Sequence, residues 1–381
     1  MDFELTDEQK LWQETVIKFS REQLAYDVTP YEQSGEFPWE AWRKCADMQL
    51  MGLPFPEEYG GCGADFLTTV LSLKALGYAC KDAGLVHALA TQILCGQQIN
   101  LFGSEELKRH FLPMLCRGEK IFAQAITEPG SGSDALSMRT RAEKQLDQYI
   151  LNGSKTFITN GPMADVVIVF AQTDPQKKTL GGISCLIVED GMAGFQKSTP
   201  LKKMGLTTLQ NGELFFDSCM VPQERLLGKE GQGAIIFNES MEWERSLLPA
   251  AHLGTLERVL ETSLSYAKER SAFGKNIGSY QAVANKITSM KINLELGRGI
   301  LFRCANLKDR RKRAPLEASI CKLFISESLK QACIDSVQLH GGYGYMCEYE
   351  IERDLRDSIA STIYSGTSEL QHNIIARLMG L

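Results

Sequence analysis

The sequence predicts an α+β protein in which a β-sheet domain separates two α-helical domains. Apolar residues keep helical spacing up to Leu115. Short apolar runs separated by Gly, Pro, Asn and Asp follow from Ile121, and helical spacing returns after Gly233 and continues to the C-terminus. We therefore expect an N-terminal α-helical domain over residues 1–120, a middle β domain over 121–228 and a C-terminal α-helical domain over 229–381.

The N-terminal block carries explicit helix signals. Thr6 is followed three residues later by Gln9, which is the pattern of a capping box, so a helix should begin there. Pro38 fits the first turn of a second helix. Longer helical patterns cover residues 67–79, 85–101 and 105–115.

In the rest of the chain, the predicted secondary structure changes from helix to strand and then back to helix. The apolar runs that predict strands cover residues 122–126, 149–151, 166–171, 183–188 and 212–216. The C-terminal helical pattern is interrupted at residues 274–278, 308–315 and 341–344. A β domain between two helical blocks leaves large seams, and such seams are places where a flat cofactor can be held.

Composition and charge exclude several classes of protein. The net charge of −6 and the pI of about 5.6 give no reason to expect a nucleic acid as partner. No apolar run approaches the ~20 residues of a membrane span, so no membrane is expected. The one dense basic run comprises Lys308, Arg310, Arg311, Lys312 and Arg313. It is either a solvated turn between helices or a docking site for an acidic partner.

The cysteines and histidines favour a reduced, metal-free, cytoplasmic protein. The eleven cysteines have no paired CxxC spacing, which is typical of packed free thiols. The five histidines show no metal-ligand spacing, so no metal site is expected.

Three segments could carry ligand chemistry. Residues 127–134, TEPGSGSD, offer backbone N–H groups and hydroxyls that could approach a phosphate, although such a loop can also be a simple turn. Residues 155–161, KTFITNG, place an aromatic ring beside a hydroxyl, which suits either ring stacking or core packing. Residues 269–274, ERSAFG, place a guanidinium suited to pyrophosphate at what could also be an ordinary helix end.

Together these segments resemble the acyl-CoA dehydrogenase family over essentially the whole chain. The resemblance rests on the five strings ITEPGSGSD at 126–134, FITNG at 157–161, RSAFG at 270–274, QLHGGYG at 338–344, and LRD at 355–357 followed by GTSE at 366–369. It implies a barrel-like middle domain, a C-terminal four-helix bundle, and FAD held between them in a homotetramer.

The resemblance also implies which residues hold the FAD. Ile126 and Thr127 would line the flavin ring, Ser133 would meet the pyrophosphate, and Phe157 with Thr159 would cover the other edge of the ring. Further contacts would come from Arg270, Phe273 and Gln281 of another subunit, from Gln338, Gly341 and Gly342 across an interface, and from Thr367 and Glu369, which would close the site.

The chemistry of this family needs a carboxylate base, because the proton α to a thioester is weakly acidic. Many members carry the base in a Tyr-Glu-Gly-Thr string, but this chain has Ser365 there, between Tyr364 and Gly366. A second family solution places the base on a helix before an Arg, which identifies Glu244 as the expected base and Arg245 as the residue that orients its helix. An exposed carboxylate in an inactive relative is the alternative.

The remaining expected site residues surround this base. The backbone N–H of Ser365 would polarise the thioester carbonyl. Trp243, whose ring could exclude water, and Tyr364 would line the substrate pocket together with Arg245.

Two strings are most similar to one branch of the family. These are SMEWER at 240–245 and the segment from Arg356 to Ser368, and they resemble the prolyl carrier-protein dehydrogenases and oxidases of secondary metabolism. The branch implies a prolyl thioester on an acyl or peptidyl carrier protein as substrate. A short or branched-chain acyl-CoA dehydrogenase and a flavin-binding protein without turnover remain alternatives, and either oxygen or an electron-transfer protein could be the electron acceptor.

Overall fold

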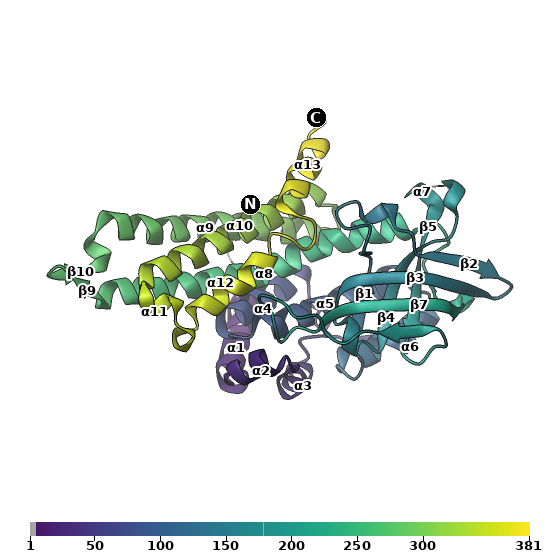
Figure 1. The fold of residues 1–381 in the computed structure, drawn as a ribbon, viewed down its shortest axis with the longest axis horizontal. Helices are drawn as coiled ribbons and strands as arrows, with labels where there is room; N and C mark the ends of the chain where they lie inside the picture. The colour runs from purple at the N-terminus through teal and green to yellow at the C-terminus, as the bar shows by residue number, and fades with distance from the viewer. Residues whose placement is uncertain (1–4, 178) are drawn as a thin grey trace.

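The computed structural model describes residues 5–177 and 179–381 and confirms the predicted α, β, α order (Figure 1). The first helix begins at the predicted capping box, in which Thr6 and Gln9 bond each other's backbone N–H. The N-terminal helices are α1 (Asp7–Gln23), α2 (Thr29–Ser34), α3 (Trp39–Asp47), α4 (Phe66–Ala79), α5 (Ala83–Phe102) and α6 (Glu105–Cys116).

The middle domain is a mixed, curved sheet with the order β6-β7-β3-β2-β4-β5-β8, in which β1 pairs with β4. The strands predicted from apolar runs are all present: β1 (Phe122–Ala125), β3 (Gln148–Thr159), β4 (Val166–Gln172), β5 (Ile183–Glu189) and β7 (Asn211–Pro222). The polar strand β2 (Arg141–Gln145) and the short strands β6 (Phe195–Lys197) and β8 (Leu226–Leu227) were missed, because they lack an apolar run.

The sheet encloses a core of its own, consistent with the barrel-like expectation. Val167, Val169, Leu186 and Leu214 are fully buried in this core. Residues on the opposite face of the sheet, such as Ile168 and Ile187, belong instead to the large core shared with the helices. Side chains alternate between the two faces because a strand has a period of two residues. The face that joins the shared core packs the β domain against the helical blocks.

The C-terminal block is a helical bundle that extends away from the sheet (Figure 1). Its long helices are α8 (Gly233–Glu269), α9 (Gln281–Asp309) and α10 (Pro315–His340), and α12 (Ile351–Ala360) packs on α10. The short helix α11 (Gly342–Tyr345) precedes α12, and α13 (Ser368–Leu378) ends the chain. The three predicted interruptions correspond to the hairpin of β9 (Ser271–Ala272) with β10 (Lys275–Asn276), the α9–α10 turn and the α10–α11 junction.

Helices α4 and α8 join the two helical blocks at very close range. A Cβ atom added at Gly77 would lie 2.0 Å from the carbonyl oxygen of Ala251, and one at Gly254 would lie 2.0 Å from that of Lys74. Only glycine permits this backbone approach. It sets the position of α8, which carries the expected base.

The basic run of the α9–α10 turn is partly structural. Lys308 and Arg313 form ion pairs with Glu239 and Glu242 of α8, whereas the side chains of residues 310–312 are exposed. The turn therefore combines an anchor to α8 with a small exposed basic surface. Among the described residues, no helix is both long and apolar enough to cross a membrane.

Candidate active site

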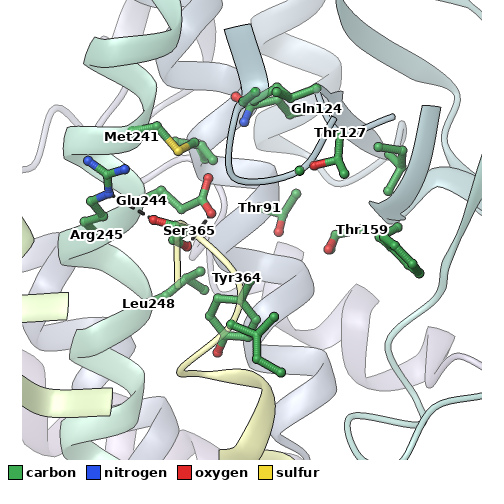
Figure 2. Close-up of a pocket in the computed structure, with 18 of the residues that line it drawn as sticks. Thr91, Gln124, Thr127, Thr159, Met241, Glu244, Arg245, Leu248, Tyr364 and Ser365 are labelled. Atoms are coloured by element: carbon green, nitrogen blue, oxygen red, sulfur yellow. Dashed lines mark hydrogen bonds between the residues drawn. The ribbon is translucent and has the colours of Figure 1, made fainter. Parts of the chain in front are cut away.

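A cavity of about 500 Å³ lies at the seam between the β domain and the two helical blocks. Its walls come from α5, the loop after β1, the end of β3, helix α8 and the segment before α13 (Figure 2). Helix α8 presents Phe237, Met241, Glu244 and Leu248 to it. Because these residues are spaced by four, three and four positions, they share one helix face. This spacing brings the expected base into the cavity.

Glu244 points its carboxylate into the cavity, whereas the guanidinium of the neighbouring Arg245 points away from it (Figure 2). The Nε of Arg245 donates to the carbonyl oxygen of Ser365 at 3.0 Å. The amide of Gln371 also donates to that oxygen, at 2.9 Å. Arg245 therefore ties α8 to the segment that carries Ser365.

Ser365 contributes its side chain as well as its backbone. Its Oγ donates to Oε1 of Glu244 at 2.5 Å. Its φ of 57° lies in the left-handed region, which a non-glycine residue rarely occupies and which is common where strain serves a site. No described residue accepts a hydrogen bond from the Ser365 N–H, so this donor is available to a ligand. The sequence analysis assigned only the backbone role.

Burial raises the pKa of Glu244 above its usual value. The hydrogen bond from Ser365 and the charges of Arg245 and Lys322 act in the opposite direction, because they favour the carboxylate, but burial is the largest effect. A carboxylate removed from water and held by one hydroxyl is a stronger base than an exposed one. The site therefore has the electrostatics that proton abstraction requires.

The opposite wall contains the residues expected to hold the flavin. Ile126, Thr127, Ser133, Phe157 and Thr159 all line the cavity, and Thr367 lies at its edge beside Ser365. The exposed Glu369 follows Thr367 in the first turn of α13 but is not part of the cavity wall. Six of the expected cofactor contacts thus gather on one surface within a single chain.

Phe157 owes its orientation to an irregularity in β3. The register between β3 and β7 shifts between Lys155 and Ile158, and Phe157 has a φ of 59°. Such a bulge re-aims a side chain, and here it leaves the aromatic ring 66% exposed beside the cavity. An exposed ring on strained backbone fits stacking on a flat cofactor better than core packing.

Lys155 and Glu128 fix the Gly/Ser loop in place, a role that the sequence analysis missed. Lys155 is fully buried and donates to the carbonyl of Ile126 and to Oε1 of Glu128, each at 2.9 Å. Glu128 also accepts from the N–H groups of Arg139 and Thr140. Burial opposes ionisation of Glu128, but Lys155 and these donors outweigh it and hold the pKa of Glu128 below its usual value.

The single chain does not bring the other expected cofactor residues to the cavity. Arg270 and Phe273 belong to the β9–β10 hairpin, which lies at the end of the bundle away from the β domain (Figure 1). The Arg270 guanidinium lies over the ring of Tyr343, and Phe273 is 96% exposed. The remaining members of this set lie at the same end, at the start of α9 and around the α10–α11 junction: Gln281, Gln338, Gly341 and Gly342.

The structure places Trp243 outside the cavity. Helix α8 turns its ring toward Phe66, with the two ring centroids 4.5 Å apart, and Lys308 lies over its face. The buried side chains of Leu94, Leu247 and Leu248 provide apolar cavity wall instead. We correct the expectation for Trp243 accordingly. The expectation was wrong because adjacent residues on a helix point about 100° apart, so the neighbour of a residue that faces the cavity need not face it too.

Tyr364 does line the cavity, as expected, and it belongs to a polar group that the sequence analysis missed. Its hydroxyl pairs with Nε2 of His252 at 2.7 Å, and its ring meets that of His87 edge to face at 4.8 Å. His87 and Thr91 of α5 also line the cavity. Their spacing of four residues, which puts both on one face of the helix, was the available signal.

Family models match the chain in three consecutive segments. They describe the acyl-CoA dehydrogenase N-terminal domain over residues 6–119, the middle domain over 123–219 and the C-terminal domain over 231–380.

Similar proteins match over the full length. The chain is 43% identical to an L-prolyl-[peptidyl-carrier protein] dehydrogenase of Pseudomonas fluorescens, with all of both chains covered. It superposes with a TM-score of 0.98 on the prolyl acyl carrier protein oxidase AnaB, at 43% identity over 99% of this chain and all of the other. The FAD complex of PigA gives a TM-score of 0.97 at 38% identity, with both chains fully covered.

Proposed function

Because the chain belongs to the acyl-CoA dehydrogenase family, we propose that it is an FAD-dependent enzyme that oxidises a prolyl thioester carried on an acyl or peptidyl carrier protein. One observation carries this proposal: Glu244, paired with Ser365, points into a cavity whose opposite wall fits a flavin. The two full-length relatives at 43% identity are named as an L-prolyl-[peptidyl-carrier protein] dehydrogenase and a prolyl acyl carrier protein oxidase, so their names describe the same reaction class. In this role the enzyme belongs to secondary metabolism.

The cavity wall fits the cofactor in shape and chemistry. Phe157 would stack near the ring system, and the hydroxyls of Thr127 and Thr159 would bond its polar edge. Residues 130 and 132 are glycines at which an added Cβ would meet no atom within 4 Å, which leaves the loop backbone open to a phosphate. When bound, FAD accepts the hydride that the substrate releases.

The chain's own residues handle the proton. Glu244 removes the proton α to the thioester, and its raised pKa makes it a competent base. The N–H of Ser365 donates to the thioester oxygen and stabilises the negative charge that develops as the proton leaves. Arg245 is a positioning residue, since it holds the Ser365 carbonyl and thereby the direction of this N–H.

We extend the proposal to a homotetramer. Arg270, Phe273 and the glycines of the α10–α11 junction lie too far along the bundle to reach the cavity of their own chain (Figure 1). The same end of the bundle exposes Phe273, Tyr345, Met346 and Tyr349. An exposed aromatic cluster of this kind supports contact with a second chain.

We also propose that the carrier protein docks near the α9–α10 turn. Lys308 and Arg313 bind the turn to Glu239 and Glu242, on a face of α8 other than the one that lines the cavity. Residues 310–312, which are Arg, Arg and Lys, are left exposed. A carrier protein is commonly acidic, so an exposed basic surface suits it, whereas the chain as a whole carries a net charge of −6.

The proposal is tested by mixing the purified protein anaerobically with prolyl carrier protein and following the flavin absorbance. Bleaching of the flavin, with a product two or four mass units lighter according to the number of oxidations, is the expected result. Faster bleaching by isovaleryl-CoA or butyryl-CoA would make the chain an ordinary acyl-CoA dehydrogenase instead. Absence of bleaching by any thioester would make it a flavin-binding protein without turnover.

A further inference from the structure

One wall of the cavity carries two hydrogen-bond acceptors that the mechanism does not use. Helix α5 presents His87, Ala90, Thr91 and Leu94 to the cavity. These residues are spaced by three, one and three positions, so they form one stripe along the helix. A wall made for an aliphatic acyl chain needs no polar group, because an unpaired buried polar atom costs free energy. The two polar members of the stripe therefore need an explanation.

Among the described residues, the His87 ring has no hydrogen-bond partner. Its side chain is 92% buried, and neither ring nitrogen bonds to any described residue. Burial, reinforced by the charge of Lys203, lowers the pKa of His87 to about 4. The imidazole is neutral at physiological pH, and a neutral imidazole keeps one nitrogen that accepts a hydrogen bond.

Thr91 also offers an acceptor to the cavity. Its Oγ1 donates to the carbonyl of His87 at 3.0 Å, which uses its proton and leaves its lone pairs free. Figure 2 shows the Glu244 carboxylate pointing toward the part of the cavity where Thr91 lies. A substrate whose α carbon faces Glu244 therefore places the neighbouring atoms of its acyl group beside α5.

Other polar groups near the acyl site form hydrogen bonds with side chains of other elements. The Tyr364 hydroxyl pairs with His252, and the Ser365 hydroxyl bonds Glu244. The Gln124 amide oxygen accepts from Ser240 and from Gln98. By contrast, Thr91 bonds only a carbonyl of its own helix, and no described residue bonds a ring nitrogen of His87, so α5 presents both as acceptors to the cavity.

We propose that His87 and Thr91 recognise the ring nitrogen of the acyl group by sharing, as acceptors, the hydrogen bond from its single N–H. This inference rests on the proposed function and deepens it, because it assigns the feature that separates a prolyl group from an aliphatic one. The nitrogen of proline is bonded directly to the carbon that Glu244 deprotonates. An acceptor for it must therefore lie on the cavity wall beside the base, and the α5 stripe provides one.

The decisive probe is a carrier protein loaded with cyclopentanecarboxylate, in which a CH₂ group replaces the ring N–H. Flavin bleaching is measured anaerobically over a range of carrier concentrations, giving an apparent Kd and a limiting rate for each thioester. We expect the unmodified enzyme to favour the prolyl thioester by roughly ten-fold or more, because a site built for an N–H rejects an analogue without it.

The variants separate recognition from packing. Thr91→Val keeps the shape of the side chain, and His87→Phe keeps a ring against Tyr364, but each removes an acceptor. We expect each to reduce the preference for prolyl, mainly by raising its Kd, while the cyclopentane thioester changes little. His87→Gln retains an acceptor and should retain more of the preference than His87→Phe.

Thr69→Val is the matched control. Thr69 is also buried in a helix and donates to the carbonyl four residues earlier, but it lies on α4 outside the cavity. It should leave the preference unchanged. If Thr91→Val and the FAD-loaded His87 variants keep the full preference for prolyl, the inference is overturned. Failure of the unmodified enzyme to be bleached by prolyl carrier protein would instead overturn the proposed function itself.

Discussion

At the scale of single residues, the proposed reaction depends on one carboxylate, that of Glu244, and on the contacts that orient it. Glu244 lies on a helix face that the periodicity of α8 turns into the cavity. Ser365, in left-handed backbone, donates its hydroxyl to this carboxylate and leaves its N–H free. The position that holds a glutamate in many family members thus has a different use here, since its hydroxyl bonds directly to the proposed base.

The first prediction concerns the base itself. Glu244→Gln should leave FAD bound, because Glu244 lies across the cavity from the flavin wall. It should lower the rate of flavin reduction by at least ~10²–10⁴, the usual contribution of a general base. Anaerobic stopped-flow absorbance measures this rate. Reduction at the unmodified rate would remove Glu244 from the mechanism.

The second prediction concerns pH. Because Glu244 must be ionised to act, flavin reduction should slow as pH falls through its raised pKa. The Ser365 hydroxyl favours the carboxylate, so Ser365→Ala should raise the pKa of Glu244 further and move the acid limb of the rate profile to higher pH. Ser368→Ala is the control, since Ser368 donates to Glu327 instead. An unshifted limb in Ser365→Ala would show that the hydroxyl does not tune the base.

At the scale of elements, the cavity wall that is expected to hold the flavin is shaped by a bulge and a buried ion pair rather than by regular strands. The bulge in β3 exposes the ring of Phe157, and the buried pair of Lys155 with Glu128 holds the Gly/Ser loop against β3. Apolar periodicity cannot reveal either feature. A bulge breaks the strand period, and a fully buried lysine is rare without a partner.

The third prediction follows from this anchor. Lys155→Met should leave Glu128 buried without its cation, which typically costs about 3–5 kcal/mol. It should also loosen the loop that carries Ile126, so we expect a lower melting temperature and a lower FAD content. Thermal unfolding and the ratio of flavin to protein absorbance measure the two effects. Lys144→Met, an exposed position on β2, is the control.

At the scale of the whole molecule, the residues expected at the cofactor site lie in two separate regions of one chain. The cavity holds the proposed base and the wall expected to contact the cofactor, while the β9–β10 hairpin and the α10–α11 junction lie at the far end of the bundle (Figure 1). Closed symmetric assembly would bring the far end of one chain to the cavity of another.

The fourth prediction is therefore that FAD content and assembly are coupled. The protein should purify yellow as a tetramer with one FAD per chain, measured by light scattering and absorbance. Arg270→Glu with Phe273→Ser should lower both the molecular mass and the FAD content. A yellow monomer that holds a full complement of FAD would exclude the shared site.

The fifth prediction concerns the carrier protein. Oxidation of prolyl carrier protein should slow with added salt, because exposed charges farther apart than a Debye length of ~8 Å at physiological ionic strength are screened. Replacing Arg310, Arg311 and Lys312 by Glu should raise KM for the carrier and remove this salt dependence. The turnover of free prolyl-CoA is the internal control. An unchanged KM would place docking elsewhere.

The sequence by itself determined the fold class, the order of the domains and the family, and it led to the proposal of Glu244 as the base. These follow from periodicity and from short motifs, both of which are local properties of the chain. The sequence also predicted that Ile126, Thr127, Ser133, Phe157, Thr159 and Thr367 share a site, but only through the resemblance.

The tertiary structure alone decided which side chains contact one another in and around the cavity. It paired Ser365 with Glu244 over 121 positions, turned Trp243 toward Phe66, and exposed His87 and Thr91 to the acyl site. Each of these outcomes depends on how α5, α8 and the segment before α13 pack together. Local patterns fix which face a residue occupies on its own element, but the neighbour of that face is set by long-range packing.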